Sequence, residues 1–289
     1  MFQIIGIVML FGLVFGSYII SGGKMGVITH SLPHEMMAIG GAGVAAFLIS
    51  NSMTVVKGSL SGLGKAFAGP KWKATDYRDL LSLLFLLTKT MKSKGVIALE
   101  SHIEKPSESG IFSRYPRIVK DHFAVDFICD TLRMMTMNLE DPHQVEDAME
   151  KQLEKHHHEH QEPAHALQNL ADALPALGIV AAVLGVIKTM GSITEPPEVL
   201  GGMIGGALVG TFLGVFLAYG LVGPLAARLK AVVDEESAFY RIIQAVLIAH
   251  LHGNAAQISV EIGRGNVPSG AQPSFLELEE ALSAIPNEA

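Results

Sequence analysis

The apolar residues of this chain gather into four long windows that hold almost no charge, at 2–20, 36–56, 174–193 and 199–227. Each provides at least about the 20 apolar residues that a helix needs to cross a bilayer. A further apolar run at 80–87 is too short to span and is bounded by Arg78, Asp79 and Lys89. The pattern therefore predicts four transmembrane helices, and we interpret the short run as a buried or interfacial helix.

The first window follows the initial methionine directly. No positively charged segment precedes it, and no small-residue cleavage site follows promptly. We therefore interpret it as a retained transmembrane helix and not as a signal peptide that is removed.

Outside the windows, apolar residues recur at helical spacing over 119–139, more loosely over 143–170, and again after residue 227. The segment 104–116 contains Pro106, Gly110 and Pro116 and is predicted to be a loop, and we expect the last 25 residues to be extended and loosely held. No strand-like alternation is found. The prediction is an all-α membrane protein with four transmembrane helices and a helical cytoplasmic domain, which the loop between spans 2 and 3 forms together with the C-terminal tail. The expected divisions are 1–56 (spans 1 and 2), 57–169 (cytoplasmic helical domain), 170–227 (spans 3 and 4) and 228–289 (cytoplasmic C-terminal helix and tail).

Composition supports this division of the chain. Only 17% of residues are charged, against 49% that are hydrophobic, whereas a soluble domain has about a quarter charged residues. The segment 57–169 holds 15 of the 21 Lys and Arg residues, which is the segregation that a bilayer imposes. The net charge of −7 gives no reason to expect nucleic-acid binding. A single cysteine, Cys129, allows no intrachain disulfide, and we interpret it as a helix-core residue.

Orientation follows from the positive residues. The short connections 21–35 and 191–198 carry one, Lys24, whereas the segment 57–169 and the tail after residue 227 carry 19. Positive residues accumulate on the cytoplasmic side. We therefore predict a multi-pass protein of the bacterial inner membrane, with the long loop and the C-terminus in the cytoplasm.

The fourth window carries glycines four residues apart, Gly202, Gly206, Gly210 and Gly214, so that one helix face has almost no side chain. Such a face allows close helix packing in lipid, either among the helices of this chain or against partner subunits around a narrow conduit. Thr211 is the hydroxyl in the middle of this face. The four predicted windows contain no buried carboxylate, although ion pathways normally carry an ionisable group within the membrane. If the chain conducts ions, the titrating group is therefore predicted to come from another chain.

Pro175 opens the third window and Pro224 lies near the end of the fourth, so both are expected at the cytoplasmic membrane surface. A proline is tolerated in a first helical turn, which would make Pro175 an ordinary helix start. Pro224 should kink its helix, because the amphipathic pattern continues beyond it. Two kinks at one depth suggest a hinge.

Several segments resemble the MotA family of flagellar motor stator subunits. They are 174–186 (LPALGIVAAVLGV), 209–214 (VGTFLG), 218–226 (AYGLVGPLA), 115–118 (YPRI) and 273–280 (PSFLELEE). The resemblance implies a ring, a pentamer, around a MotB-type partner whose single span carries the ion-binding aspartate. It also implies that ion flow turns the ring against the rotor protein FliG, without a cofactor and without enzymatic activity.

The resemblance also implies roles for single residues. Lys92 and Glu100 match the rotor-facing charges, although the first is usually arginine, so that the charge is kept but the planar bidentate fork is lost. Pro175 and Pro224 match the prolines that couple to ion flow, and Thr211 matches the threonine of the ion pathway. Sodium-driven relatives carry a threonine where this chain has Ala182, and alanine has no oxygen that could bind sodium, so the resemblance favours protons.

Three alternatives and one unexplained motif remain to be weighed from the sequence. ExbB and TolQ are related proton-driven energisers of outer-membrane processes, but those proteins generally have three spans. A metal-cation transporter would need ligands within the membrane, and a membrane enzyme would need a catalytic constellation. Neither is evident in the sequence. His156 and His160 lie four residues apart and could chelate a metal on a helix, although a solvated polar helix explains the cluster more simply.

Overall fold

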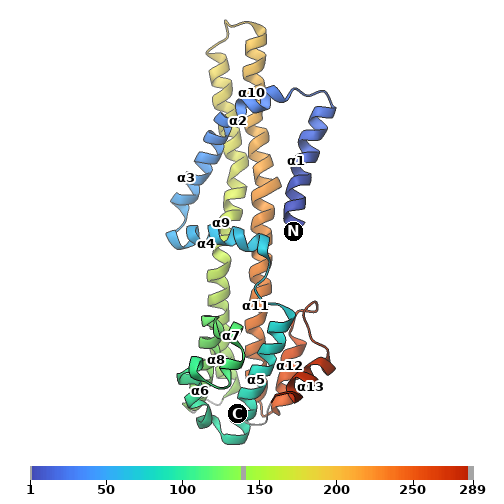
Figure 1. Cartoon of the computed structure of the whole chain (residues 1–289). Coiled ribbons are helices and arrows are strands. Elements are labelled where there is room, and N and C mark those ends of the chain that lie inside the picture. The colour runs from blue at the N-terminus through green and yellow to red at the C-terminus, as the bar shows by residue number, and fades with distance from the viewer. Residues whose placement is uncertain (1, 138–140, 286–289) are drawn as a thin grey trace. The chain divides into compact units, whose positions relative to one another are not determined.

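The structure is a computed structural model that describes residues 2–137 and 141–285, and every regular element within these ranges is helical (Figure 1). The chain divides into two compact units. The first comprises Met1–Gly69 and His160–Val232, and the second comprises Pro70–Glu159 and Val233–Ala289. Two long helices, α9 (Pro142–Met190) and α11 (Gly223–Leu251), contribute residues to both. The predicted segments 57–169 and 228–289 include residues 138–140 and 286–289, which lie outside the described residues.

Among the residues that the structure describes, four helices are long and apolar enough to cross a membrane, as the sequence predicted. Span 1 is α1 (Phe2–Ile20). Span 2 is the helix Met25–Ser50, built from α2 (Met25–Glu35), a π-helical turn η1 (Met36–Gly40) and α3 (Gly41–Ser50). Span 3 lies in α9, and span 4 lies in the helix Pro197–Leu251, built from α10 (Pro197–Val215), a π-helical segment η5 (Phe216–Val222) and α11. The predicted all-α, four-span fold is confirmed.

The predicted position of span 2, 36–56, is wrong. Its helix begins 11 residues earlier, at Met25, and ends at Ser50. His30, His34 and Glu35 lower the mean hydropathy of the first turns, so a window chosen by hydropathy excluded them. Asn51 and Ser52 are extended, and a separate helix, α4 (Met53–Ala68), begins after Ser52, whose hydroxyl accepts a hydrogen bond from the amide of Val55 at 3.4 Å.

Helix α4 packs through small residues on one face. A methyl group on Gly58 would lie 2.8 Å from Pro163 Cγ, and one on Gly62 would lie 2.6 Å from Leu229 Cδ2. The Ser59 hydroxyl donates to the carbonyl of Val55 at 2.8 Å and is buried. Pro163 belongs to α9 and Leu229 belongs to α11. Helix α4 therefore packs on the two helices that carry spans 3 and 4.

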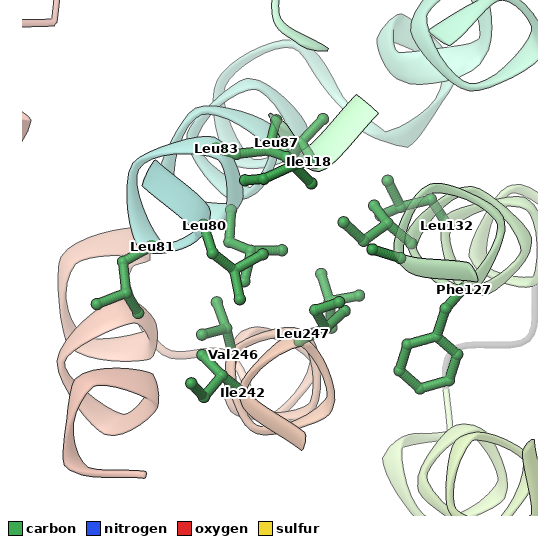
Figure 2. Packing of buried hydrophobic residues seen from close by; sticks show 14 of the residues in the cluster. Leu80, Leu81, Leu83, Leu87, Ile118, Phe127, Leu132, Ile242, Val246 and Leu247 are labelled. Atoms are coloured by element: carbon green, nitrogen blue, oxygen red, sulfur yellow. The ribbon is translucent and has the colours of Figure 1, made fainter. Parts of the chain in front are cut away.

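The second unit contains α5 (Ala74–Lys94), α8 (His122–Thr136), α12 (Ala256–Gly265), α13 (Phe275–Ser283), parts of α9 and α11, and short helical segments between α5 and α8. These segments are η2 (Val96–Leu99), α6 (Glu100–Glu104), η3 (Pro106–Glu108), η4 (Phe112–Arg114) and α7 (Pro116–Val119). Figure 2 shows side chains of α5 packing with those of α8 and α11. Leu80, Leu83 and Leu87 are fully buried in this core, which confirms that the run 80–87 is a buried helix and not a fifth span.

Two predictions about the second unit need correction. The predicted loop 104–116 contains the one-turn helices η3 and η4. The last 25 residues, expected to be extended, include α13, whose Leu278 and Leu282 are buried in the core. Ser274 and Glu277 form a capping box at its first turn, and this signal together with the spacing of Leu278 and Leu282 would have predicted a helix.

Asp121 joins three parts of the second unit. Its Oδ1 accepts a hydrogen bond from the amide of Ala124 and so caps α8, while Oδ2 lies 2.6 Å from Lys71 Nζ and 3.1 Å from the Tyr240 hydroxyl. Burial alone would raise the pKa of Asp121, but these donors together hold it below its usual value.

Cys129 lies in α8 with 4% of its surface exposed. Burial raises the pKa of its thiol to about 12. The interpretation of Cys129 as a helix-core residue is confirmed, and the thiol is protonated and unreactive at neutral pH.

Candidate ion pathway

The centre of the first unit is a contact between the backbones of α9 and α10, which lie side by side (Figure 1). A methyl group on Gly178 would lie 2.9 Å from the carbonyl oxygen of Gly210 and 3.1 Å from Gly214 Cα. A methyl group on Gly214 would lie 2.7 Å from the carbonyl oxygen of Leu174. No residue larger than glycine fits at either position without displacing backbone.

The four glycines of the predicted face have different surroundings. Gly210 and Gly214 are buried against α9, and Gly206 faces Ser31 of α2, whose hydroxyl oxygen would lie 2.8 Å from an added methyl group. Gly202 is exposed, and no described atom would lie within 4 Å of a methyl group there. The glycine face is therefore covered by helices of its own chain at Gly214 and is open at Gly202. The reason is that residues four apart on an α-helix are rotated by about 40° from one another around the helix axis.

Thr211 and Ala182 lie next to a close contact between their two helices. A methyl group on Gly210 would lie 3.3 Å from Ala181 Cβ, so the adjacent residues Thr211 on α10 and Ala182 on α9 sit on neighbouring helices at a similar depth. Both are half-buried.

Glu35 is a carboxylate that the sequence interpretation missed. It lies at the end of α2, inside span 2. Its Oε2 would be 2.5 Å from a methyl group on Gly210, and within the described part of the chain this oxygen is buried without a hydrogen-bond partner. The expectation that the spans hold no buried carboxylate is therefore wrong, because the predicted window for span 2 began one residue after Glu35.

A cavity of about 490 Å³ opens beside Glu35. Its polar lining comes from α2 and from the end of α9, and comprises His30, Ser31, His34, Glu35 and Lys188. Gly202 and Gly206 of α10 form part of the opposite wall. Polar groups at membrane depth are tolerated where they face the bundle interior or a water-filled space. The lining therefore indicates a hydrated cavity that reaches the glycine face.

Pro175 does not begin a helix. It lies in the interior of α9, 33 residues after Pro142, the first residue of that helix. The interpretation as an ordinary first-turn proline is wrong, because the apolar pattern of 143–170 and that of span 3 belong to one continuous helix. A proline in a helix interior leaves a carbonyl one turn earlier without its amide donor.

Pro224 follows a change in helix type. The π-helical segment η5 ends at Val222, and Pro224 is the second residue of α11 and is exposed. A π-helical turn is wider than an α-helical turn and appears where the regular hydrogen-bond ladder is interrupted. Here it gives the proline ring room that an α-helical turn would not leave, so the helix passes Pro224 without ending.

Lys92 and Glu100 lie in the second unit. Lys92 is in the last turn of α5, Glu100 is the first residue of α6, and both are exposed. Between them Gly95 has a φ of 85°, and Ile97 has 78% of its surface exposed. Along the chain, two exposed opposite charges thus flank an exposed apolar residue. A hydropathy pattern alone could not have identified Ile97 as exposed.

The histidine cluster is distributed over different contacts. His156 stacks on Phe123 with ring centroids 3.6 Å apart, and His157 Nδ1 lies 2.6 Å from the Ser237 hydroxyl. Over residues 2–137 and 141–285, no three His, Cys, Asp or Glu side chains are gathered so that they could hold a metal ion.

Two family models and several known proteins match this chain over most of its length. Residues 4–95 match the family model of the Motility protein A N-terminal region, and residues 120–241 match that of the MotA/TolQ/ExbB proton channel family. The chain is 40% identical to Motility protein A of Escherichia coli K12 over 287 residues, which cover 99% of this chain and 97% of the relative.

Two solved structures share the fold. One is the C. jejuni MotAB structure, with a TM-score of 0.72 and 20% identity over 94% of this chain and 98% of the matched chain. The other is the flagellar MotAB stator complex from Bacillus subtilis, with a TM-score of 0.67 and 22% identity over 89% of this chain and 92% of the matched chain.

Proposed function

This chain belongs to the Motility protein A (MotA) family and is a MotA-type stator subunit of the flagellar motor, and on that premise we propose how it converts ion flow into torque. Several copies surround a MotB-type partner with a single span, and the channel that they form together conducts protons. The ring is a pentamer, and the partner supplies an aspartate within the membrane. The two matched structures, C. jejuni MotAB and the MotAB stator complex from Bacillus subtilis, support a partner of this kind.

The protein is a multi-pass protein of the inner membrane. We place the second unit, with the long loop and the C-terminus, in the cytoplasm. The distribution of Lys and Arg supports this orientation, because 19 of the 21 lie in 57–169 and after residue 227. The turns at 21–24 and 191–196 are then periplasmic, and so is the mouth of the cavity beside Lys188.

The observation that carries the proposal is the close packing of α9 on α10 at Gly178, Gly210 and Gly214. Because these helices meet through glycine, their flanking residues Thr211 and Ala182 can reach a partner helix laid along the same seam. Thr211 contributes the hydroxyl of the ion pathway. Ala182 contributes no oxygen, which supports proton transport over sodium transport. Gly202, at the open end of the face, provides a surface on which that partner helix packs.

Pro175 and Pro224 transmit the conformational change that accompanies ion flow from the pathway to the second unit. Each lies in a long helix that supplies residues to both units, and each interrupts the backbone ladder of that helix. A change in contacts at the partner's aspartate alters the bend at these positions, because a helix bends most easily where a hydrogen bond is missing.

The rotor contact is the surface formed by Lys92, Ile97 and Glu100, which presses on FliG. Exposed charges at the rim of a contact set its register and speed of formation more than its strength. An exposed apolar residue between them supplies the area that would be buried on contact. The lysine at position 92 serves as a point charge, without the bidentate geometry of an arginine.

Family membership sets aside the alternatives considered from the sequence. The match to the MotA/TolQ/ExbB model alone would leave an ExbB or TolQ-type energiser open, but the Motility protein A N-terminal model covers residues 4–95. A metal-cation transporter has no support from these relatives.

The coupling ion is tested by motility. A strain that depends on this stator should swim when sodium is removed and should stop when the proton gradient is collapsed. Swimming speed that follows sodium at a constant proton-motive force would overturn the proton assignment.

A further inference from the structure

Glu35 is an ionisable residue inside a membrane span, where such residues usually have a function. It lies in span 2, its Oε2 is buried, and that oxygen has no hydrogen-bond partner among the described residues. A buried carboxylate without a partner is unfavourable when charged, so such a group takes up a proton, binds water or meets a ligand. Packing alone therefore does not account for a glutamate at this position.

The glycine face leaves room for this side chain. Oε2 would be 2.5 Å from a methyl group on Gly210, and Ser31 takes the corresponding place one turn earlier, opposite Gly206. The Glu35 carboxyl thus lies against the turn of α10 that carries Thr211, the proposed pathway hydroxyl.

The polar lining of the cavity would admit water to Glu35. Its titratable groups are His30 and His34 on α2 and Lys188 on α9, and α10 contributes glycines and apolar residues to the wall. All three of these side chains are exposed, whereas Glu35 is half-buried. Glu35 is therefore the least exposed of the titratable groups that line the cavity.

The chemistry of the lining fits a proton and not a metal cation. Sodium and calcium need several oxygen ligands, and the lining offers one carboxyl and one hydroxyl together with a lysine ammonium that repels cations. Among the described residues, His30, His34 and Glu35 are not gathered so that they could hold a metal ion such as zinc. A proton needs one acceptor that can be reached through water. Histidine and carboxyl groups are the side chains that usually relay protons through membrane proteins.

We propose that Glu35 is a proton-binding site of this chain itself, which receives a proton from water in the cavity and passes it towards the carboxylate of the partner. Glu35 gains the proton on Oε2 and loses it again to the next acceptor, so that each cycle returns the carboxylate to its starting state. His30 and His34 line the aqueous entrance to this site. The inference rests on the proposed stator function and adds to it a second titrating group, supplied by this chain.

The test uses the full chain assembled with its single-span partner in vesicles under an imposed proton gradient. Glu35→Gln removes the proton site at nearly constant size, Glu35→Asp keeps a carboxyl, and Glu195→Gln, an exposed carboxylate in the turn before α10, serves as the control. Proton flux per assembled complex should fall at least about tenfold in Glu35→Gln. It should be largely kept in Glu35→Asp and unchanged in Glu195→Gln.

A second readout separates a proton site from a packing role. Infrared spectra recorded over an external pH titration should show a protonated-carboxyl band that is lost in Glu35→Gln and shifted in Glu35→Asp. Normal flux in Glu35→Gln, or spectra identical to those of the wild type in both variants, would overturn the proposal. If Glu35→Gln does not assemble, the shift of the band in Glu35→Asp decides.

The same preparation distinguishes this proposal from the proposed function. Replacing the partner's intramembrane aspartate by asparagine should abolish flux if the shared channel exists. If that variant abolishes flux but Glu35→Gln does not, only the Glu35 assignment fails. If that variant conducts normally, the shared-channel function itself fails.

Discussion

Gly178 on α9 and Gly214 on α10 meet backbone to backbone, so that a methyl group on Gly214 would lie 2.9 Å from Gly178 Cα. Gly214→Ala should therefore separate the two helices and cost about 1–3 kcal/mol, the usual range for overpacking. Thermal unfolding of the purified full chain in detergent measures this effect. Gly201→Ala on the same helix, where a methyl group meets no described atom within 4 Å, is the matched control and should leave the melting temperature unchanged or slightly higher.

Pro224 is expected to act as a hinge and not only as a packing residue. Pro224→Ala restores a backbone donor and allows the π-helical segment Phe216–Val222 to relax towards a regular α-helix. The ring should then assemble at normal levels but turn poorly, because a hinge mutation removes the coupling and leaves the site intact. The measurement is torque per assembled stator, with abundance determined in the same cells. Wild-type torque at wild-type abundance would reduce Pro224 to a structural feature.

The charged pair of the proposed rotor surface can be tested by reversal. Lys92→Glu or Glu100→Lys should reduce torque while membrane insertion and ring assembly stay intact, because both side chains are exposed. A compensating charge change on FliG should restore part of the torque. Reversal of Lys151, an exposed residue paired with Asp147 in α9, is the control. If both reversals at positions 92 and 100 swim normally, the rotor contact lies elsewhere.

Asp121 should make the second unit sensitive to acid. Its pKa is held below the usual value in the folded state by Lys71, Ala124 and Tyr240, so its contribution is present above the unfolded pKa and is lost as the pH falls through the folded value. Asp121→Asn keeps a cap for α8 but loses the charge, and we expect a loss of about 1–2 kcal/mol at neutral pH.

The loss caused by Asp121→Asn should shrink as the solution is acidified below the usual carboxyl range. Thermal unfolding of the full chain at several pH values provides the test. Glu108→Gln removes an exposed ion pair with Lys105 and should have little effect at any pH. A cost at Asp121 that does not change with pH would contradict the electrostatic explanation.

The sequence predicted the features that depend on long-range hydropathy. Four spans and the buried helix around Leu80, Leu83 and Leu87 follow from the length and flanks of apolar runs, and the structure has them. The continuation of a helix beyond Pro224 also followed from periodicity. The π-helical segment before it did not, because a change of hydrogen-bond register leaves no trace in an apolar pattern.

Polar residues that face a cavity led to a wrong predicted start for span 2. His30, His34 and Glu35 excluded the first turns of span 2, although a helix can carry such groups where it borders a polar cavity instead of lipid. Glu35 was therefore missed as an intramembrane carboxylate. The partners of Gly210 and Gly214 could likewise not be derived, because spacing fixes a helix face but not which neighbour covers it. The assignments of Thr211, Ala182, the two prolines and the rotor charges stay predictions.

The central claim is that proton flow needs both this chain and the intramembrane carboxylate of its partner. The direct measurement is proton flux into vesicles that contain this chain alone, this chain with its single-span partner, or this chain with a partner whose aspartate is replaced by asparagine. Although Glu35 supplies one proton site within this chain, a single site beside an open cavity does not complete a path. We predict flux only for the chain with the unmodified partner. Comparable flux from this chain alone, or from the complex that lacks the aspartate, would contradict the account.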